Sequence, residues 1–201
     1  MRRFGVVVLF ALGASAVGAC GLVPDRSFED DPALTGRITS VRLENRSGDV
    51  TVRGTDDGTV SLHRRVAYTT SPPDGPTHRV ENGVLVLGDC GVNCEVDYTV
   101  VLPEGTPVSG STSHGEIALT AVGTVDVVTG SGDVTVTTAV PQDVRVRTSN
   151  GEIALTVPRG SYQVRAQSKN GDRNLRVPHT PGAGRRIDLT TGNGDITLSP
   201  A

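Results

Sequence analysis

The sequence contains few of the residue types on which several common functions depend. Among its 201 residues there are no Trp, one Met, three Phe and three Tyr, and the formal net charge at pH 7 is −3. No run of Lys and Arg stands out along the chain. Nucleic-acid-binding proteins need a basic surface and, for single strands, aromatic side chains on which bases stack. We therefore expect no nucleic-acid partner.

Catalytic motifs are also missing. The chain has no G-x-S-x-G sequence, and Gly192-x-Gly194 leads into a strand pattern rather than a helix. The histidines lack the spacing of metal ligands: His63, His78, His114 and His179. We expect no catalytic residue, no cofactor and no metal site, and hence a protein that is not an enzyme. A glycan-active enzyme is a remote alternative, because β-helices host polysaccharide lyases and hydrolases.

The first nineteen residues have the composition of a secretory signal. Arg2 and Arg3 precede an apolar stretch over residues 4–17, which is shorter than a membrane span and ends in small residues. The motif VGAC at 17–20 resembles the bacterial lipobox, whose cysteine is acylated and becomes the mature N-terminus. This resemblance implies lipid attachment at Cys20, and so a protein anchored to a bacterial cell membrane on its extracytoplasmic side. Ordinary signal cleavage that leaves a free thiol is the alternative.

An internal repeat organises the rest of the chain. Residues 20–36 lack periodicity and predict a tether, followed by a β-repeat domain over residues 37–200 that is most regular over about 105–200. Each copy reads apolar-x-apolar, a turn, then apolar-x-apolar, and 22 of the 24 apolar positions are occupied as expected in a chain that is only 36% hydrophobic. The copies are centred on Gly48, Gly115, Gly132, Gly151, Gly171 and Gly194.

The repeat predicts an all-β fold. Alternation with period two indicates strands with one buried face, and one copy is too small to bury its own apolar side chains. We therefore expect a β-solenoid or β-helix-like stack of short strands with a less regular N-terminal β region, in which Ile117, Val134, Ile153 and Ile196 share one interior. The alternative is a β-sandwich in which each copy forms a hairpin.

An acidic residue follows every central glycine. In a stack these side chains would form a column: Asp49, Glu116, Asp133, Glu152, Asp172 and Asp195. Stacked carboxylates and turn carbonyls are suitable ligands for a hard cation, which makes this a candidate cation column. The calcium-binding β-roll repeats every nine residues, however, and the present repeat is about twice as long. A solvent-exposed acidic edge without a bound ion is the simpler interpretation.

The two remaining cysteines predict a disulfide. Cys90 and Cys94 lie between strand candidates at 84–87 and 96–102, so a bridge would close a tight loop at the tip of a hairpin. An even pair in an exported protein is typical of a disulfide. A redox or metal-binding CxxxC would need further cysteines or a nearby histidine, which the sequence does not supply.

A family resemblance agrees with these patterns. The lipobox, the segments SGDVTV, HGEIAL, NGEIAL and NGDITL, and the LPEG turn before the regular copies resemble the bacterial DUF4097 family of β-strand-repeat proteins with an adhesin label, over residues 38–200. The resemblance implies an exported β-repeat domain and no catalytic residues. We expect a membrane-anchored lipoprotein whose domain presents an interaction surface to an envelope protein or polysaccharide. The alternative is an envelope sensor that binds a cation or an envelope polymer along the acidic column.

Overall fold

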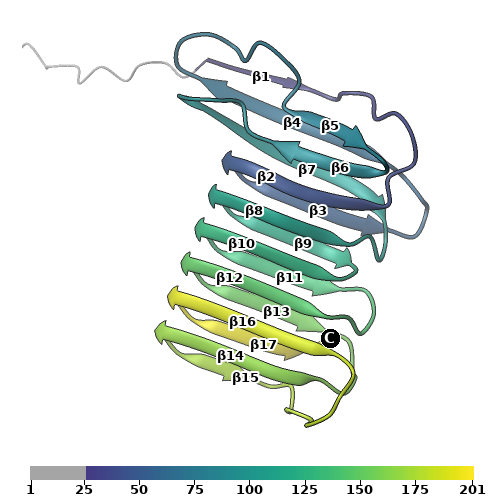
Figure 1. Cartoon of the computed structure of the whole chain (residues 1–201), viewed down its shortest axis with the longest axis vertical. Coiled ribbons are helices and arrows are strands. Elements are labelled where there is room, and N and C mark those ends of the chain that lie inside the picture. Colours follow the sequence, from purple (N-terminus) through teal and green to yellow (C-terminus); the bar gives the residue numbers. More distant parts are fainter. Residues whose placement is uncertain (1–25) are drawn as a thin grey trace, which may run out of the picture.

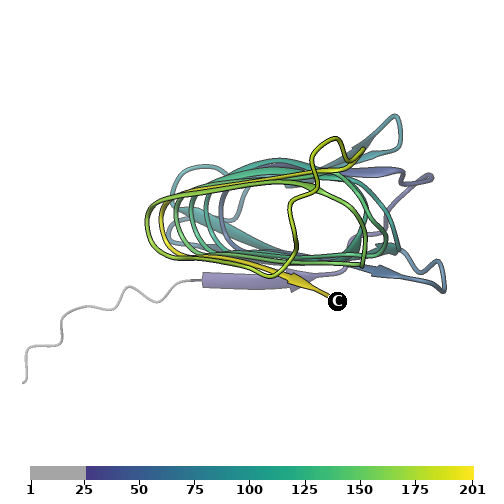
Figure 2. The same ribbon diagram turned by 90° about the horizontal axis from the view of Figure 1, so that it is seen from below.

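The computed structural model describes residues 26–201, and the regular structure of this part of the chain consists of β-strands. The strands form two sheets that face each other across one apolar interior (Figure 1). Seen along the stack, the coils superimpose as a flattened ring (Figure 2). Each coil places one strand in each sheet, so the fold is the predicted β-solenoid-like stack.

Seventeen strands make up the two sheets. The eight-stranded sheet contains, in spatial order, β14 (Gln163–Asn170), β16 (Arg186–Asn193), β12 (Val144–Asn150), β10 (Val125–Ser131), β8 (Val108–His114), β2 (Ser40–Ser47), β6 (Val84–Gly88) and β5 (His78–Glu81). The nine-stranded sheet contains, from the opposite end, β1 (Arg26–Asp30), β4 (Ser61–Tyr68), β7 (Cys94–Pro103), β3 (Val50–Thr55), β9 (Ile117–Val122), β11 (Val134–Thr138), β13 (Ile153–Val157), β17 (Ile196–Pro200) and β15 (Arg173–Leu175).

Equivalent positions of the copies pair with one another. Val134 of β11 lies opposite Ile117 of β9 and Ile153 of β13, and Ile153 lies opposite Ile196 of β17. All four side chains are buried. Pairing is parallel between these coils, and the two arms of a copy lie in different sheets. The hairpin alternative is therefore excluded.

The central glycines form the corner at which the chain passes from the eight-stranded to the nine-stranded sheet. All six have a positive φ, between 112° and 153°. Each also lies against a neighbouring coil: a Cβ on Gly132 would run into the carbonyl oxygen of Gly115, and one on Gly151 into that of Gly132. Glycine is needed here both for its backbone conformation and for the close approach of the coils.

The N-terminal region is more regular than the sequence predicts. Leu85 of β6 pairs with Val41 of β2, and Tyr98 of β7 pairs with Val50 of β3, in the register of the other copies. Strands β6 and β7 therefore form a seventh coil. They belong to different sheets, which corrects the expectation of a hairpin. The Cys90–Cys94 disulfide lies at the corner between them and closes the longer turn of this coil.

Part of the predicted tether is a strand. Residues 26–30 form β1, which pairs antiparallel with β4, so that Phe28 lies opposite Val66. The side chain of Asp30 binds Arg64 of β4, and the Arg64 guanidinium lies 5.6 Å from the centroid of the Phe28 ring. These contacts, made to residues more than thirty positions away, order a segment that has no strand pattern of its own.

The order of the coils along the stack differs from their order in the chain. The β2/β3 coil lies between β6/β7 and β8/β9, and the C-terminal β16/β17 coil lies between β12/β13 and β14/β15. The stack consequently ends in the irregular β14/β15 coil, whose β15 is three residues long and exposed. At the other end, β1, β4 and β5 pair antiparallel and cap the parallel array.

We predict that Gly132→Ala lowers the free energy of unfolding by about 2–4 kcal/mol, because it combines a disfavoured positive φ with a steric clash against backbone. Chemical denaturation monitored by circular dichroism measures the change. Gly184→Ala is the control, because Gly184 has no positive φ and a Cβ there would meet no atom within 4 Å. Equal stability of the two variants would contradict the corner assignment.

Candidate functional site

The predicted acidic column exists as one row along the corner of the stack. Its spatial order follows the strand pairing and runs Asp49, Glu116, Asp133, Glu152, Asp195, Asp172. Asp97 extends the row beyond Asp49, because Tyr98 pairs with Val50. Sequence reasoning missed Asp97 because Val96 occupies the position of the corner glycine. The segment Asp97–Val100, DYTV, nevertheless repeats the DVTV pattern of two other copies and was the available signal.

The aspartates of this row bind the backbone of the next coil. Four of the five accept a hydrogen bond at Oδ1 from a main-chain N–H: Asp97 from Asp49 (2.9 Å), Asp49 from Glu116 (2.7 Å), Asp133 from Glu152 (2.7 Å) and Asp195 from Asp172 (2.8 Å). Asp172 lies in the terminal coil, beyond which the described structure has no further coil. All four bonds run in the same direction along the stack. In these contacts the carboxylates satisfy corner N–H groups, which is a structural role.

A cation is not needed to account for this row. Among residues 26–201 no group of three or more His, Cys, Asp or Glu side chains gathers in a way that could hold a metal ion. The aspartate oxygens named above already face N–H donors. The candidate cation column remains a prediction, and no described feature of the corner favours it over an exposed acidic edge.

A second row, on the inner side of the corner, consists of small polar side chains. Asn45, Thr112, Thr129, Thr148 and Thr191 are buried there. Four of the five bind carbonyl groups of the corner, as when Thr191 donates to Gly151 O (2.9 Å) and Asn45 donates to both Gly48 O and Val96 O (3.2 Å each). The exception is Thr129, whose Oγ1 has no hydrogen-bond partner in the described structure. This row therefore satisfies backbone acceptors between the two sheets.

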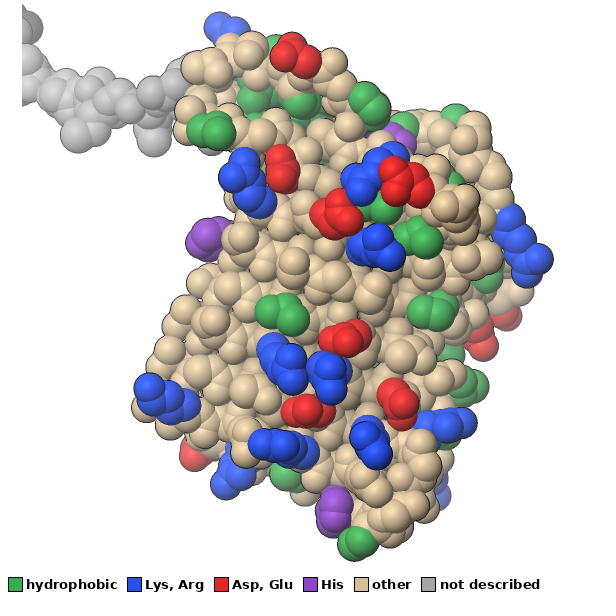
Figure 3. All heavy atoms as spheres, in the orientation of Figure 1, with side chains coloured by type: hydrophobic (Ala, Val, Ile, Leu, Met, Phe, Trp, Pro, Cys, Tyr) green, Lys and Arg blue, Asp and Glu red, His purple; other side chains and the backbone are tan. Residues whose placement is uncertain are grey.

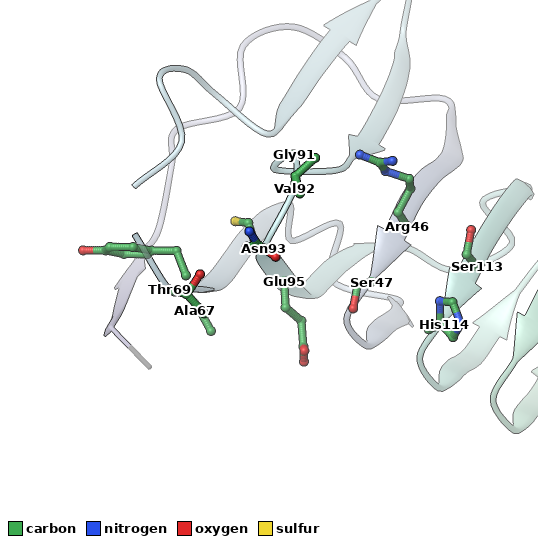
Figure 4. Close-up of a pocket in the computed structure, with 12 residues that line it drawn as sticks. Arg46, Ser47, Ala67, Thr69, Gly91, Val92, Asn93, Glu95, Ser113 and His114 are labelled. Carbon is green, nitrogen blue, oxygen red and sulfur yellow. The ribbon is translucent and has the colours of Figure 1, made fainter. Parts of the chain in front are cut away.

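A hollow of about 510 Å³ lies beside the disulfide, between the disulfide loop and the ends of β2, β4 and β8. Its lining includes the ionisable side chains of Arg46, Glu95 and His114 as well as Tyr68, and Arg46 pairs with Asp89 at 3.4 Å. Figure 4 shows the side chains of Arg46, Glu95 and His114 pointing in different directions rather than toward one point. The exposed side chain of Val92 forms part of the rim. The arrangement does not assemble a nucleophile, a base and an oxyanion site.

A buried polar network joins β1 to the capping strands. The Arg64 guanidinium donates to both carboxylate oxygens of Asp30 (2.6 and 2.8 Å) and to Thr77 Oγ1 (2.9 Å). The Tyr98 hydroxyl lies 2.7 Å from Thr77 Oγ1 and 2.8 Å from Gly88 O. The hydrogen bond from Arg64 lowers the pKa of Asp30, and burial raises the pKa of Tyr98 to about 12. In this network Asp30 is ionised and Tyr98 is neutral, and their hydrogen bonds hold the capping strands together.

His78 of β5 lies near this network and is influenced by the charges of Arg64 and Asp30. Burial lowers its pKa from the usual 6.5, and the positive charge of Arg64 lowers it further. Its Nδ1 atom is buried without a hydrogen-bond partner in the described structure. Sequence reasoning found no role for this histidine, because its environment is created by β4 and β7 rather than by neighbouring residues.

The predicted lipid-attachment residue Cys20 and the signal over residues 1–19 lie outside the described residues. The part of the chain that is described contains no helix of the length and apolarity needed to span a membrane.

Comparisons with known proteins agree with this architecture. A family model described as Toastrack DUF4097 matches residues 34–199. A candidate cell adhesion protein from Clostridium sporogenes has a crystal structure with a TM-score of 0.62 and 15% identity, over 88% of this chain and 100% of that chain. Two candidate adhesins, from Bacteroides fragilis and Parabacteroides merdae, give TM-scores of 0.36 and 0.37 at 13% and 8% identity, each over 88% of this chain and over 97% and 96% of theirs. No curated protein matches the chain.

We predict that Asp133→Ala destabilises the stack by about 1 kcal/mol, because the N–H of Glu152 loses its acceptor at a solvent-exposed corner. Asp133→Asn retains an acceptor oxygen and should cost less. Glu152→Ala is the matched control, because Glu152 accepts no such bond in the described structure. The measurement is urea denaturation with and without millimolar calcium. Stabilisation by calcium that disappears in Asp133→Asn would establish the cation column instead.

We predict that stability falls as the pH is lowered through about 6.5, because unfolded His78 binds a proton more readily than the folded residue does. Because the pKa of His78 is lower in the folded state, the loss of stability is absent above about pH 6.5 and grows below it. His78→Gln should flatten the decline in melting temperature between about pH 7.5 and pH 5. This pH range lies above the pH values at which Asp30 becomes protonated. An unchanged pH profile in His78→Gln would contradict the assignment.

Proposed function

Because the chain belongs to the Toastrack DUF4097 family, we propose that it is a non-enzymatic, adhesin-like interaction domain held on the outer face of a bacterial membrane by a lipid at Cys20. The observation that carries the proposal is the continuous pairing of coils from β6/β7 to β14/β15. Such a ladder gives a rigid body with broad outer faces that can serve as extended binding surfaces.

The outer face of the nine-stranded sheet supports a role in broad surface contact. Between β9 and β17 its outward positions carry short side chains, and the long side chain of Arg53 projects from the neighbouring strand β3. One row across the sheet contains Thr51, Ala118, Thr135, Ala154 and Thr197, and the next contains Thr120, Thr137, Thr156 and Ser199. A flat face of this kind suits contact with an extended partner, such as an envelope protein or polysaccharide, better than enclosure of a small molecule.

The similarity to the Clostridium sporogenes protein supports the same proposal. That protein is described as a candidate cell adhesion protein, and it has the same fold over its whole length. An adhesion role requires display outside the cell, which agrees with the secretory signal and lipobox of the present chain.

The start of β1 restricts how far the proposed anchor can lie from the domain. Because β1 begins at Arg26, the chain from Cys20 to the first strand can span at most about 20 Å. An acylated Cys20 would thus keep the β1 end of the stack near the bilayer and direct the β14/β15 end away from it. Two or more acyl chains are sufficient for stable anchoring.

We predict that Cys20→Ala moves the protein from the membrane fraction to the soluble fraction of expressing cells. The reason is that the variant cannot be acylated at this position, and the described domain has no membrane-spanning helix. Metabolic labelling with a radioactive fatty acid, followed by ultracentrifugation, measures both properties. Attachment of the cells to surfaces should fall to the level of cells that lack the chain.

The control is the double variant Cys90→Ala, Cys94→Ala, which removes the disulfide and keeps Cys20. It should remain labelled and membrane-bound. A Cys20→Ala protein that still carries the fatty acid would refute the anchor. A correctly anchored protein whose deletion changes no attachment phenotype would refute the adhesin-like role.

A further inference from the structure

Basic residues are concentrated in one short part of the chain. Residues 159–186 contain seven of its 19 basic residues and one of its 22 acidic residues. The seven are Arg159, Arg165, Lys169, Arg173, Arg176, Arg185 and Arg186, which we call the basic end. No two of them are adjacent except Arg185 and Arg186, so the sequence shows no basic run.

The fold gathers these residues at one end of the stack. Arg165 and Lys169 lie on the terminal strand β14, and Arg173 lies on β15 of the same coil. Arg176 follows β15, and Arg186 opens β16 opposite Gln163 of β14. All seven side chains are exposed. Figure 3 shows Lys and Arg side chains, with acidic side chains between them, over the lower coils of the eight-stranded sheet, where β14 and β16 lie.

The cations of the basic end have no ion-pair partner within the described structure. None of its seven side chains forms an ion pair with a described residue, whereas Arg46, Arg64, Arg65, Arg79 and Arg145 elsewhere in the stack each do. Their polar contacts are mostly with neutral groups, such as Arg173 with Ala166 O (3.3 Å) and Arg185 with Pro141 O (3.1 Å). Uncompensated like charges repel one another and favour binding of an anion.

Protection of an edge strand explains only part of this arrangement. Charged side chains on an edge do prevent pairing with another chain, and Arg173 covers the open side of β14 in this way. One or two cations are sufficient for that purpose. Arg159, Lys169 and Arg176 have no side-chain hydrogen bond to a described residue, and their charge therefore remains available.

The distribution of these cations over the surface indicates whether the partner is a small anion or an extended polymer. They extend over both sheets and the connecting loops instead of converging on one pocket. Arg165 and Arg186 line a groove of about 550 Å³ together with Arg145, and this groove also contains Asp126, Asp143 and Asp188, so its charges are balanced. The other five cations of the basic end lie outside this groove. A single small anion would meet only one or two cations of the basic end. A linear polymer with repeated anionic groups would meet several at once, and its affinity would rise through multivalency.

We propose that the basic end binds a linear polyanion of repeating phosphate groups in the cell envelope. Guanidinium groups bind phosphate through paired hydrogen bonds, and six of the seven residues are arginines. This inference goes beyond the proposed function and does not depend on the lipid anchor. If the anchor is present, the basic end lies at the end of the stack opposite to β1 and the bilayer, which favours a polymer over lipid headgroups (Figure 1).

The test compares two triple charge reversals in the purified full chain. The first is Arg159→Glu, Lys169→Glu, Arg176→Glu. The second, the matched control, is Arg42→Glu, Arg53→Glu, Arg147→Glu, which changes the net charge equally at exposed arginines that also lack a side-chain partner in the described structure. The probes are polyphosphate and poly(glycerol phosphate), with orthophosphate, polyglutamate and phosphatidylglycerol vesicles as comparisons. Binding is measured by fluorescence anisotropy at several salt concentrations, and circular dichroism checks that each variant is folded.

We expect both phosphate polymers to bind the unaltered chain, with an affinity that falls as salt increases, and the first triple variant to bind at least about tenfold more weakly. The control variant should keep most of the affinity, and orthophosphate should not compete at equal phosphate concentration. Equal losses in both variants would overturn the assignment of the basic end. Equal or stronger binding of polyglutamate would overturn the phosphate specificity, and binding of the vesicles without binding of the polymers would place this end against a membrane instead.

Discussion

The close approach of neighbouring coils at the glycine corner is the constraint on which the rest of the structure depends. Neighbouring coils can stay paired around this corner only if the backbone of one coil lies directly against the carbonyl groups of the next. A Cβ at Gly132 would prevent this contact. The residues around the glycine follow from that contact. Asp133 after it binds an exposed N–H of the adjoining coil, and in other copies the Thr or Asn three positions before the glycine, such as Thr191, binds a carbonyl group on the inner side. The repeat thus encodes a corner as well as two hydrophobic arms.

Much of the fold could be predicted because this corner leaves a clear pattern in the sequence. Glycine, an acidic residue and two apolar pairs recur in one register, and parallel stacking is the arrangement that buries them. The seventh coil was harder to find, because Val96 replaces the glycine and the disulfide loop lengthens its turn. Strand β1 could not be predicted from local pattern, since Arg64 of β4 and the ring contact with Phe28 position it. The same limit applies to the basic end, whose residues are brought together by the fold.

The order of the coils was not predictable, for a physical reason. Copies with the same register offer nearly the same edge to a neighbour, so the repeat pattern does not specify which coil lies beside which. The side chains favour the observed order. Ile187, Leu189, Ile196 and Leu198 of the β16/β17 coil are fully buried between two neighbours, whereas Leu175 of β15 is 42% exposed at the end of the stack. A coil with weak apolar arms loses least when it has only one neighbour.

The two ends of the stack solve the problem of open edges in different ways, and this difference links the fold to its proposed partners. At the β1 end, antiparallel strands and the Asp30–Arg64 pair close the array with compensated charge. At the other end, the three-residue strand β15, the contacts of His179 and Thr180 with the open edge beside β14, and exposed arginines stop further pairing. If acidic side chains of the protein neutralised these arginines, the arginines would no longer keep other strands away from the edge. Together with the cations that the edge does not need, these arginines form a surface that an anionic polymer can occupy, and a flexible polymer without strand-forming backbone would bind there without extending the ladder.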